Sequence, residues 1–428
     1  MNYICMECGR KTALSDRAIY RCECGGLLDM VWDAGSTDAE RLKRLFDARL
    51  GERGSPLSGG VWRYKELIHP ELPLSSIVTK YEGNTALYEN DRLGSYAGVR
   101  RLWLKALSEN PSGSFKDNGM TVAVSHGRWL GYDRFACTST GNTSSSMAMY
   151  AALCGSEAIV LLPALGVALN KALQTEAYGA KLLRTEGGYD EGIRFLERHA
   201  LSLDLYVCNS INPLRIEGQK SIAFELAHQL GWSLPDWLIV PGGALSNAAA
   251  IGKGLGELYQ AGFIAAMPRI AVVQAEGASP FHRMVETGRR PLVPELRPDT
   301  VASALRIGNP PNWPKAWRDA LERTNGVTVS VADRDILEAK ARIDRSGIGC
   351  EPASAASLAG LRALVAKGIV HKDETAVCIL TGHMLKDTDA IVQSLRYAGG
   401  TSQRQTRAEA RAPLPLLPEV IRSELARA

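Results

Sequence analysis

The segment Asn110-Pro-Ser-Gly-Ser-Phe-Lys-Asp-Asn-Gly119 places a lysine between a predicted strand and a predicted helix. The apolar run Arg101–Lys105 precedes it, and residues with helical spacing follow it at Met120, Ala123, Val124, Gly127 and Leu130. This spacing predicts an amphipathic helix that begins near Lys116. The positive end of that helix and burial against Phe115 would lower the lysine pKa and favour a nucleophile or Schiff-base former. Taken alone, the position also fits an ordinary surface lysine in the first turn of a helix.

Short apolar or β-branched runs alternate with helical segments from about residue 100 onward, which predicts βαβ units and parallel sheets. A first series of strands is expected at Arg101–Lys105, Phe135–Cys137, Ala158–Leu162, Lys181–Leu183 and Leu205–Cys208. A second series, after a helical segment at Ile216–Gln229, is expected at Leu238–Val240, Ile270–Val273, Val327–Val331 and Ala376–Leu380. The sequence therefore predicts two α/β units facing each other, with Ala278–Pro314 as a long connection.

The predicted fold class is α/β, with two lobes of parallel or mixed sheets flanked by helices and a small N-terminal module. We place the module at residues 1–30, the large domain at 31–120 and 216–400, and the smaller α/β domain at 121–215. The remaining segment, residues 401–428, begins with a stretch rich in Gln, Arg and Pro, and we expect it to be poorly ordered.

The overall composition is that of a globular protein. The chain has 428 residues, 45% of them apolar and 22% charged, which suits about two to four domains. A net charge of +4 does not indicate a nucleic-acid or membrane-surface partner. No run approaches the roughly 18 apolar residues of a membrane helix, and the N-terminus lacks the apolar core of a signal peptide. We therefore expect a cytoplasmic protein with no membrane or nucleic-acid partner.

Four of the nine cysteines lie within the first 24 residues, at Cys5, Cys8, Cys22 and Cys24. The C-x2-C and C-x-C pairs are each followed by glycine, so tight turns bring backbone N–H groups toward the thiolates. This spacing predicts a zinc ribbon in which zinc has a structural role. Four free buried thiols are the alternative interpretation, and the spacing does not distinguish zinc from iron.

Two further junctions between a strand and a helix are suited to anions. The segment Pro241-Gly-Gly-Ala-Leu-Ser-Asn247 offers small residues and backbone N–H groups to a phosphate, although a plain tight turn would look the same. The segment Ser139-Thr-Gly-Asn-Thr-Ser-Ser-Ser146 offers hydroxyls and an amide to an α-carboxylate. Because parallel strands bring such junctions to one edge of a sheet, both are expected near Lys116. A phosphate-bearing aldehyde that condenses with lysine and amino acids is pyridoxal phosphate.

The lysine segment resembles that of pyridoxal-phosphate enzymes of fold type II, the fold of the tryptophan synthase β subunit. Within that group, the chain resembles the threonine synthases from about residue 80 to 390. The segments that carry this resemblance are Tyr81-Glu-Gly-Asn-Thr85, Asn209-Ser-Ile-Asn-Pro-Leu-Arg-Ile-Glu-Gly-Gln219, Arg306-Ile-Gly-Asn-Pro310, Gly349-Cys-Glu-Pro-Ala-Ser-Ala-Ala356 and Leu380-Thr-Gly-His-Met-Leu-Lys386. The chain departs from the residues usual in the family at Asn118, Met384 and the phosphate loop.

The resemblance implies a role for each matched residue. Lys116 would bind the cofactor covalently, Asn142 would contact its ring hydroxyl and Thr381 its pyridine nitrogen. The cofactor phosphate would be held by Gly243, Ala244, Leu245, Ser246 and Asn247. The substrate α-carboxylate would bind at Ser139, Thr140, Asn142 and Thr143, with Thr85 nearby, and the substrate phosphate at Asn209, Ser210, Asn212 and Arg215. The structural alternative for Arg215 is a surface ion pair with Glu217 or Glu225.

The activity implied by the resemblance is that of a pyridoxal-phosphate-dependent lyase in threonine biosynthesis. Such an enzyme converts O-phospho-L-homoserine and water into L-threonine and phosphate by γ-elimination and β-addition, and the fold implies a homodimer. The same cofactor motifs also fit a serine/threonine dehydratase or a β-replacement enzyme. A non-catalytic family member that acts as an interaction module is a further alternative. His126, His228 and His383 are candidate general acids, although a structural role is typical of such histidines, and only His383 belongs to a matched segment.

Overall fold

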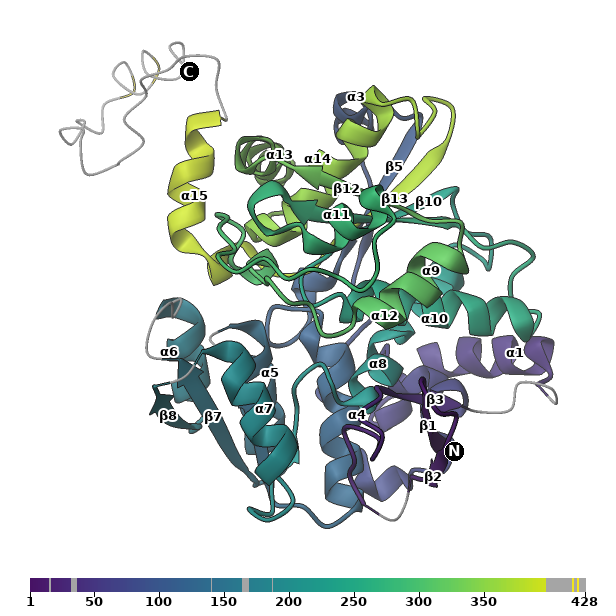
Figure 1. The fold of residues 1–428 in the computed structure, drawn as a ribbon. Helices are drawn as coiled ribbons and strands as arrows, with labels where there is room; N and C mark the ends of the chain where they lie inside the picture. The colour runs from purple at the N-terminus through teal and green to yellow at the C-terminus, as the bar shows by residue number, and fades with distance from the viewer. Residues whose placement is uncertain are drawn as a thin grey trace.

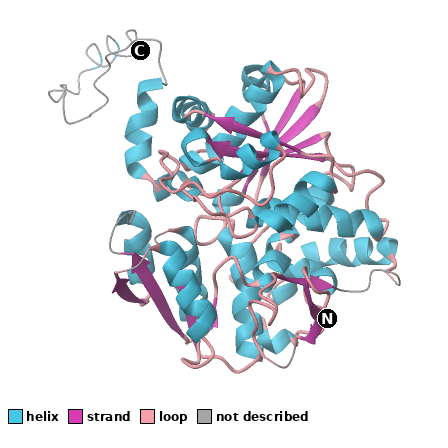
Figure 2. Ribbon diagram, in the orientation of Figure 1, coloured by secondary structure: helices cyan, strands magenta, loops and turns pink. Residues whose placement is uncertain are grey.

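The computed structural model describes residues 1–14, 17–31, 37–139, 141–163, 169–186 and 188–397, together with positions 418 and 422. Its strands form a six-stranded, a four-stranded and a three-stranded sheet, and helices separate the two larger sheets (Figures 1 and 2). The predicted tail at 401–428 lies outside the described residues except for those two positions.

The six-stranded sheet has the order β12-β11-β10-β13-β5-β4. Its strands are β4 (Leu87–Glu89), β5 (Arg101–Ala106), β10 (Trp237–Pro241), β11 (Arg269–Ala275), β12 (Val327–Val331) and β13 (Thr375–Leu380). All neighbours are parallel except the antiparallel pair of β4 and β5. The central strand β10 is buried along its whole length because helices cover both faces, which explains its continuous apolar run.

The four-stranded sheet is parallel throughout, with the order β8-β7-β6-β9. It consists of β6 (Arg134–Thr138), β7 (Glu157–Pro163), β8 (Lys181–Thr185) and β9 (Tyr206–Val207). All nine predicted strands are confirmed, as is the arrangement of two α/β units with parallel and mixed sheets. The six-stranded sheet draws on residues 87–106 and 237–380 and the four-stranded sheet on 134–207, while the exact domain boundaries stay a prediction.

The helices before the second series of strands are α1 (Ala39–Leu50), α2 (Lys65–Ile68), α3 (Asp91–Ala97), α4 (Lys116–Trp129), α5 (Asn142–Leu153), α6 (Leu169–Ala177), α7 (Tyr189–His199), α8 (Pro213–Gln219) and α9 (Ser221–Gln229). The helices that follow β10 are α10 (Ser246–Gln260), α11 (Pro280–Thr287), α12 (Trp313–Ala316), α13 (Asp333–Arg345), α14 (Pro352–Ala366) and α15 (Thr388–Ser394). The helical segment expected at 216–229 is therefore two helices that meet at Lys220. The expected long connection at 278–314 is wrong in part, because α11 lies within it.

The lysine-bearing helix α4 begins at Lys116 as predicted, but it is not amphipathic. Every residue from Asp117 to Gly127 is buried, polar and apolar alike. The reason is that α5 and α8 both pack along α4, so little of its surface faces solvent. The polar side chains of its first turns consequently bond to other buried polar groups.

The N-terminal sheet is antiparallel, with the order β2-β1-β3, formed by β1 (Asn2–Cys5), β2 (Lys11–Ala13) and β3 (Leu28–Val31). Tyr3, Leu28 and Met30 belong to the same core cluster as residues of α4, α8 and α10. Figure 1 shows β3 beside α8, and the two elements are in contact. Across the described ranges, no helix combines the length and hydropathy that crossing a membrane requires.

Candidate active site

Lys116 is the first residue of α4 and follows a loop that is paired with the end of β13. Ser114 forms a bridge with Gly382, and the Phe115 N–H donates to the Thr381 carbonyl over 2.9 Å. The helix has no side-chain N-cap at Phe115. Lys116 is half-buried, and its Nζ lies 4.1 Å from the centroid of the Phe115 ring, the contact expected from the sequence. Lys116 therefore lies at a helix N-terminus, next to the carboxyl end of a central strand.

Asp117 fixes the lysine loop to α5. One carboxylate oxygen accepts the Ser112 backbone N–H at 2.7 Å, and the other accepts the Ser112 hydroxyl at 2.6 Å and the Ser146 hydroxyl at 2.5 Å. Burial raises the pKa of Asp117, whereas these hydrogen bonds to the carboxylate lower it. The lysine loop is thereby attached to both larger sheets.

Thr381 lies at the carboxyl end of β13 and is 4% exposed. Its hydroxyl is 3.0 Å from the Ser354 hydroxyl, which also accepts the backbone N–H groups of Thr381 and Gly382 at 2.8 and 2.9 Å. Ser354 therefore sets the rotamer of the residue that was assigned to the pyridine nitrogen. Ser354 lies in the segment Gly349–Ala356, but no spacing pattern indicates its role.

Asn142 and Glu351 link the two larger sheets. The Asn142 Nδ2 donates to both carboxylate oxygens of Glu351 at 3.0 and 3.1 Å, whereas Asn142 Oδ1 is buried without a partner among the described residues. Glu351 is the N-cap residue of α14, and its N–H donates to the Gly382 carbonyl over 2.9 Å. A Cβ on Gly382 would lie 2.4 Å from this carboxylate, so a larger residue there would displace the Glu351 side chain. Sequence analysis missed Glu351 as a residue of this site.

The predicted phosphate loop connects β10 to α10. Gly243 approaches the backbone of residue 304 so closely that a Cβ on it would lie 2.5 Å from the Ala304 carbonyl oxygen. Leu245 has a φ of 64°, and α10 starts after it without a side-chain cap. Both polar atoms of the buried Asn247 amide lack a partner within the described ranges. The open N–H groups of a 15-residue helix and an unpaired amide suit an anion such as a phosphate.

The residues assigned to the α-carboxylate lie at the start of α5. Ser139 is 9% exposed and its hydroxyl accepts the Gly141 N–H at 3.1 Å, while Thr143 is half-buried. α5 has no side-chain cap at Gly141. Thr140 lies outside the described residues.

Thr85 is buried, and its hydroxyl and N–H both lie within hydrogen-bond distance of Glu225 Oε1, at 3.3 and 3.2 Å. Lys105 pairs with the same carboxylate and donates to the Thr85 carbonyl over 2.7 Å. Glu225 and Lys105, which sequence analysis did not assign to the site, thus hold the loop that carries Thr85.

Arg215 is completely buried on α8, so the expected alternative of a surface ion pair is wrong. Its Nη1 donates to the Cys208 carbonyl over 2.7 Å, and its Nε and Nη2 have no partner among the described residues. Glu217 pairs with Lys220 and Lys253, and Glu225 pairs with Lys105. Burial lowers the pKa of Arg215, and among the described residues no carboxylate forms an ion pair with it. An anion that accepts from both open donors would satisfy this guanidinium.

The other residues assigned to the substrate phosphate differ in what they offer. Both amide atoms of Asn209 pair with the backbone of Thr138, at 2.8 and 3.0 Å, and the Asn212 amide caps α8 and donates to the Val207 carbonyl. The Ser210 hydroxyl is buried without a partner within the described ranges. Ser210 and Arg215 therefore have open donors, whereas the two asparagines hold the backbone that positions them.

Two of the three candidate histidines belong to the framework. His126 lies 2.9 Å from the Tyr206 hydroxyl and 3.3 Å from the Leu14 carbonyl, and burial lowers its pKa to about 4. His228 bonds to Tyr64 and Asp47. His383 donates its backbone N–H to the Gly113 carbonyl over 2.9 Å in the lysine loop, and its ring accepts the Leu385 N–H. Only His383 lies beside the lysine loop.

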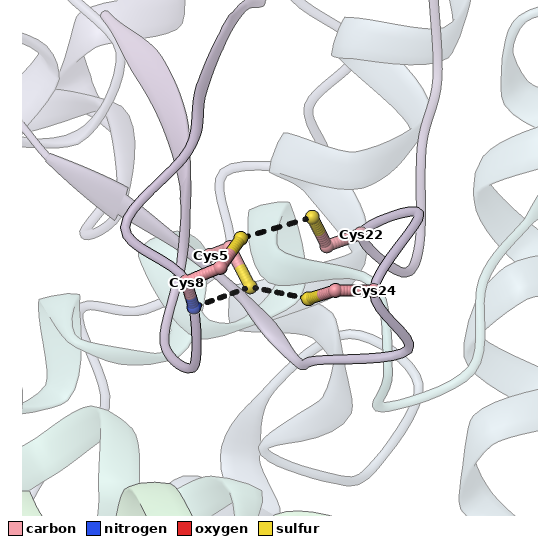
Figure 3. Close-up of side chains that lie close together, drawn as sticks. All are labelled: Cys5, Cys8, Cys22 and Cys24. Carbon is pink, nitrogen blue, oxygen red and sulfur yellow. Dashed lines mark hydrogen bonds between the residues drawn. The ribbon is translucent and has the colours of Figure 1, made fainter.

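The four N-terminal cysteines form one cluster in which all sulfur atoms lie within 4.8 Å of one another (Figure 3). Cys5 Sγ is 3.5 Å from Cys24 Sγ, and Cys8 Sγ is 3.6 Å from Cys22 Sγ. The N–H groups of Glu7 and Cys8 lie 3.4 and 3.5 Å from Cys5 Sγ. Such spacing is compatible with four thiolates around one ion.

The site fits an anionic cofactor that binds a lysine. The N-termini of α4, α5 and α10 follow strands or loops of the two larger sheets, and α5 and α10 begin without a side-chain cap. Buried polar atoms without partners among the described residues occur at Asn142, Asn247, Ser210 and Arg215. In a folded protein such atoms are rare, and a ligand would satisfy them.

Comparisons with known proteins agree with this arrangement. The family "Pyridoxal-phosphate dependent enzyme" matches residues 78–382. The threonine synthase of Methanocaldococcus jannaschii is 43% identical over 91% of this chain and 94% of its own length. That of Methanosarcina acetivorans is 43% identical over 91% of this chain and 93% of its own. The solved structure of Escherichia coli threonine synthase, 17% identical, superposes over the whole of both chains with a TM-score of 0.71, which shows a shared fold. The chain belongs to the threonine synthase family of pyridoxal-phosphate-dependent enzymes.

Proposed function

We propose that the protein converts O-phospho-L-homoserine and water into L-threonine and inorganic phosphate. The observation that carries this proposal is Arg215, a fully buried cation with two open donors on the segment that resembles the substrate-phosphate block of threonine synthases. A dehydratase acting on serine or threonine has no second phosphate to bind, and a buried unpaired guanidinium would only destabilise such a protein.

The side chains divide the work between cofactor and substrate. Lys116 would bind pyridoxal phosphate covalently, the loop at 243–247 its phosphate, Asn142 its ring hydroxyl and Thr381 its ring nitrogen. When bound, the cofactor supplies an electron sink next to the α-carbon. A threonine hydroxyl opposite the ring nitrogen does not enforce protonation of that nitrogen as a carboxylate would, which favours elimination and addition over transamination.

On the substrate side, the open N-terminus of α5 would bind the α-carboxylate, and Arg215 with Ser210 the phosphate. Lys116 would remove the α-proton and then serve as acid or base at the β-carbon, where water adds after phosphate leaves the γ-carbon. Buried Asp117, Glu351 and Ser354 keep these groups in register through the hydrogen bonds described above.

The test is a parallel assay of the cofactor-loaded protein on four substrates: O-phospho-L-homoserine, O-phospho-L-serine, L-serine and L-threonine. We expect equimolar threonine and phosphate from O-phospho-L-homoserine alone, and no product from the Lys116→Ala variant. Keto acid from serine or threonine as the main product would instead identify a dehydratase. No product from any of the four, in protein that carries the cofactor absorption band, would indicate a family member without catalysis.

We also propose that the cysteine cluster binds a structural zinc ion. The support is the approach of four sulfur atoms to within 4.8 Å, with N–H groups directed at Cys5 Sγ. Metal analysis of protein purified without added metal should give one zinc per chain, and the Cys8→Ser variant should contain less. Iron or no metal in the wild-type protein would contradict the assignment. The homodimer expected from the fold stays a prediction, which light scattering of the purified protein would test. The cytoplasmic location also stays a prediction.

A further inference from the structure

The N-terminal ribbon is attached to the rest of the protein through a buried carboxylate. Asp29 lies on β3 opposite Ile4, the neighbour of the cysteine ligand candidate Cys5 on β1. Asp29 is 4% exposed, and its carboxylate pairs with Lys253 at 2.9 Å and with Arg318. Although burial acts in the opposite direction, these cations and Lys315 hold the pKa of Asp29 well below its usual range. Asp29 is therefore a charged anchor of the ribbon in the protein core.

The same lysine also holds α8. Lys253, on α10, donates to the Met30 carbonyl over 2.8 Å and pairs with the carboxylate of Glu217, which is 0% exposed. The second oxygen of Glu217 pairs with Lys220. The ammonium of Lys253 thus joins β3 of the ribbon to the helix that carries Arg215, two residues before Glu217.

On its other side, α8 is packed against the lysine helix α4 with no space between the backbones. A Cβ on Gly218 would lie 2.1 Å from the Asn118 carbonyl, and a Cβ on Gly119 would lie 3.0 Å from Arg215 Nε. α8 has only seven residues, so its position is determined by these contacts and by the Glu217 ion pairs. Loss of the pairs on the ribbon side would allow the guanidinium to move relative to Lys116.

We propose that Asp29 and Lys253 are positioning residues for the substrate phosphate. Through this pair, the metal-bound N-terminal ribbon holds Arg215 in place. This inference rests on the proposed function and assigns the ribbon a role in substrate binding. The ribbon residues touch neither the cofactor site nor the α-carboxylate site among the described contacts. Their loss should therefore weaken binding of phosphate-bearing ligands and leave cofactor binding unchanged.

The primary test measures inorganic phosphate binding to the holoenzyme by calorimetry, and turnover of O-phospho-L-homoserine. In Asp29→Asn, which keeps the shape and removes the charge, we expect the Kd for phosphate and the KM to rise about tenfold. The kcat and the cofactor absorption band should stay within about twofold of wild type. Asp29→Glu, which restores the charge, should recover part of the affinity. Glu66→Gln is the control, because it removes the carboxylate from the half-buried Arg49–Glu66 pair, which includes no residue of α8.

A second variant covers the case in which Asp29→Asn does not fold. Cys24→Ser removes an exposed member of the cluster and should release the metal, with the same rise in Kd and KM. Phosphate affinity equal to wild type in metal-free Cys24→Ser, or in folded Asp29→Asn, would overturn the inference. If wild-type protein turns over O-phospho-L-homoserine while Asp29→Asn behaves like Glu66→Gln, only the positioning role fails. If wild-type protein does not turn over this substrate, the proposed function itself fails.

Discussion

Replacing Arg215 by alanine should lower kcat/KM for O-phospho-L-homoserine by about 10²- to 10⁴-fold. The reason lies in the geometry of its guanidinium. Nη1 is fixed on the Cys208 carbonyl, so Nε and Nη2 are left open along one edge. That edge is the one with which arginine forms two parallel hydrogen bonds to a phosphate.

The magnitude follows from the number of hydrogen bonds lost. Each hydrogen bond between charged groups contributes about 1.5–3 kcal/mol, so two contribute about 3–6 kcal/mol. At about 1.4 kcal/mol per factor of ten, that range corresponds to the predicted loss of about 10²- to 10⁴-fold. Arg215→Lys keeps the charge but has no fork, so its kcat/KM should fall between wild type and Arg215→Ala.

The assay is phosphate release at varied substrate concentration, with L-serine binding as the phosphate-free reference. We expect Arg215→Ala to bind L-serine and the cofactor as wild type does, because the residues proposed for both sites are elsewhere. Thermal unfolding separates loss of contact from loss of fold, since the substitution leaves a cavity in a fully buried site. A folded Arg215→Ala variant with kcat/KM within threefold of wild type would refute the argument.

Three further predictions concern residues of α4. Lys116→Ala should abolish the absorption band of the bound cofactor together with product formation, and a retained band would contradict the assignment of the lysine. Gly119→Ala should raise KM more than it lowers kcat and lower the stability by about 1–3 kcal/mol, because the new Cβ would lie 2.7 Å from the Arg215 carbonyl oxygen; unchanged KM and melting temperature would contradict this. His126 has a folded-state pKa of about 4, below its unfolded value of 6.5, so the unfolded state takes up more protons as the pH falls from 6.5 to 4. The free energy of unfolding should therefore decline by about 3 kcal/mol as the pH falls from 6.5 to 4. Denaturant titrations at several pH values should show a shallower decline for His126→Gln. An equally steep decline in this variant would contradict the prediction.

The strands were predictable because parallel strands covered on both faces are continuous apolar runs. β10 and β13 are two such runs; the predicted bounds differ from the observed ones by one residue at each end of β10 and at the start of β13. β4 was missed because it has only three residues at the sheet edge, two of them exposed. The helical pattern after Lys116 located α4 correctly but wrongly predicted an amphipathic helix with an exposed polar face. The polar residues of that helix are instead buried against other polar residues.

The partners of the charged residues were not predictable from spacing. Arg215 lies near Glu217 and Glu225 in the sequence, which suggested an ion pair. Instead, Lys253 of α10 pairs with Glu217 and Lys105 of β5 pairs with Glu225. Lys253 reaches Asp29 across a separation of 224 residues. Such pairs arise from the packing of α8, α10 and the ribbon, and one sequence contains no periodic signal for them.

Hydrogen-bond satisfaction separates the framework of this site from its ligand contacts. Asn209 and Arg215 belong to the same sequence segment and were assigned the same role, but both polar atoms of the Asn209 amide are paired with the backbone of Thr138. A buried polar group that is already paired gains nothing from a ligand, whereas one left open is costly until a ligand binds it. The open atoms at Arg215 and Ser210 are therefore the ones whose loss should weaken substrate binding directly. Asn209 has an indirect role. Its two hydrogen bonds fix the end of β6 and therefore the start of α5, at which the α-carboxylate is proposed to bind.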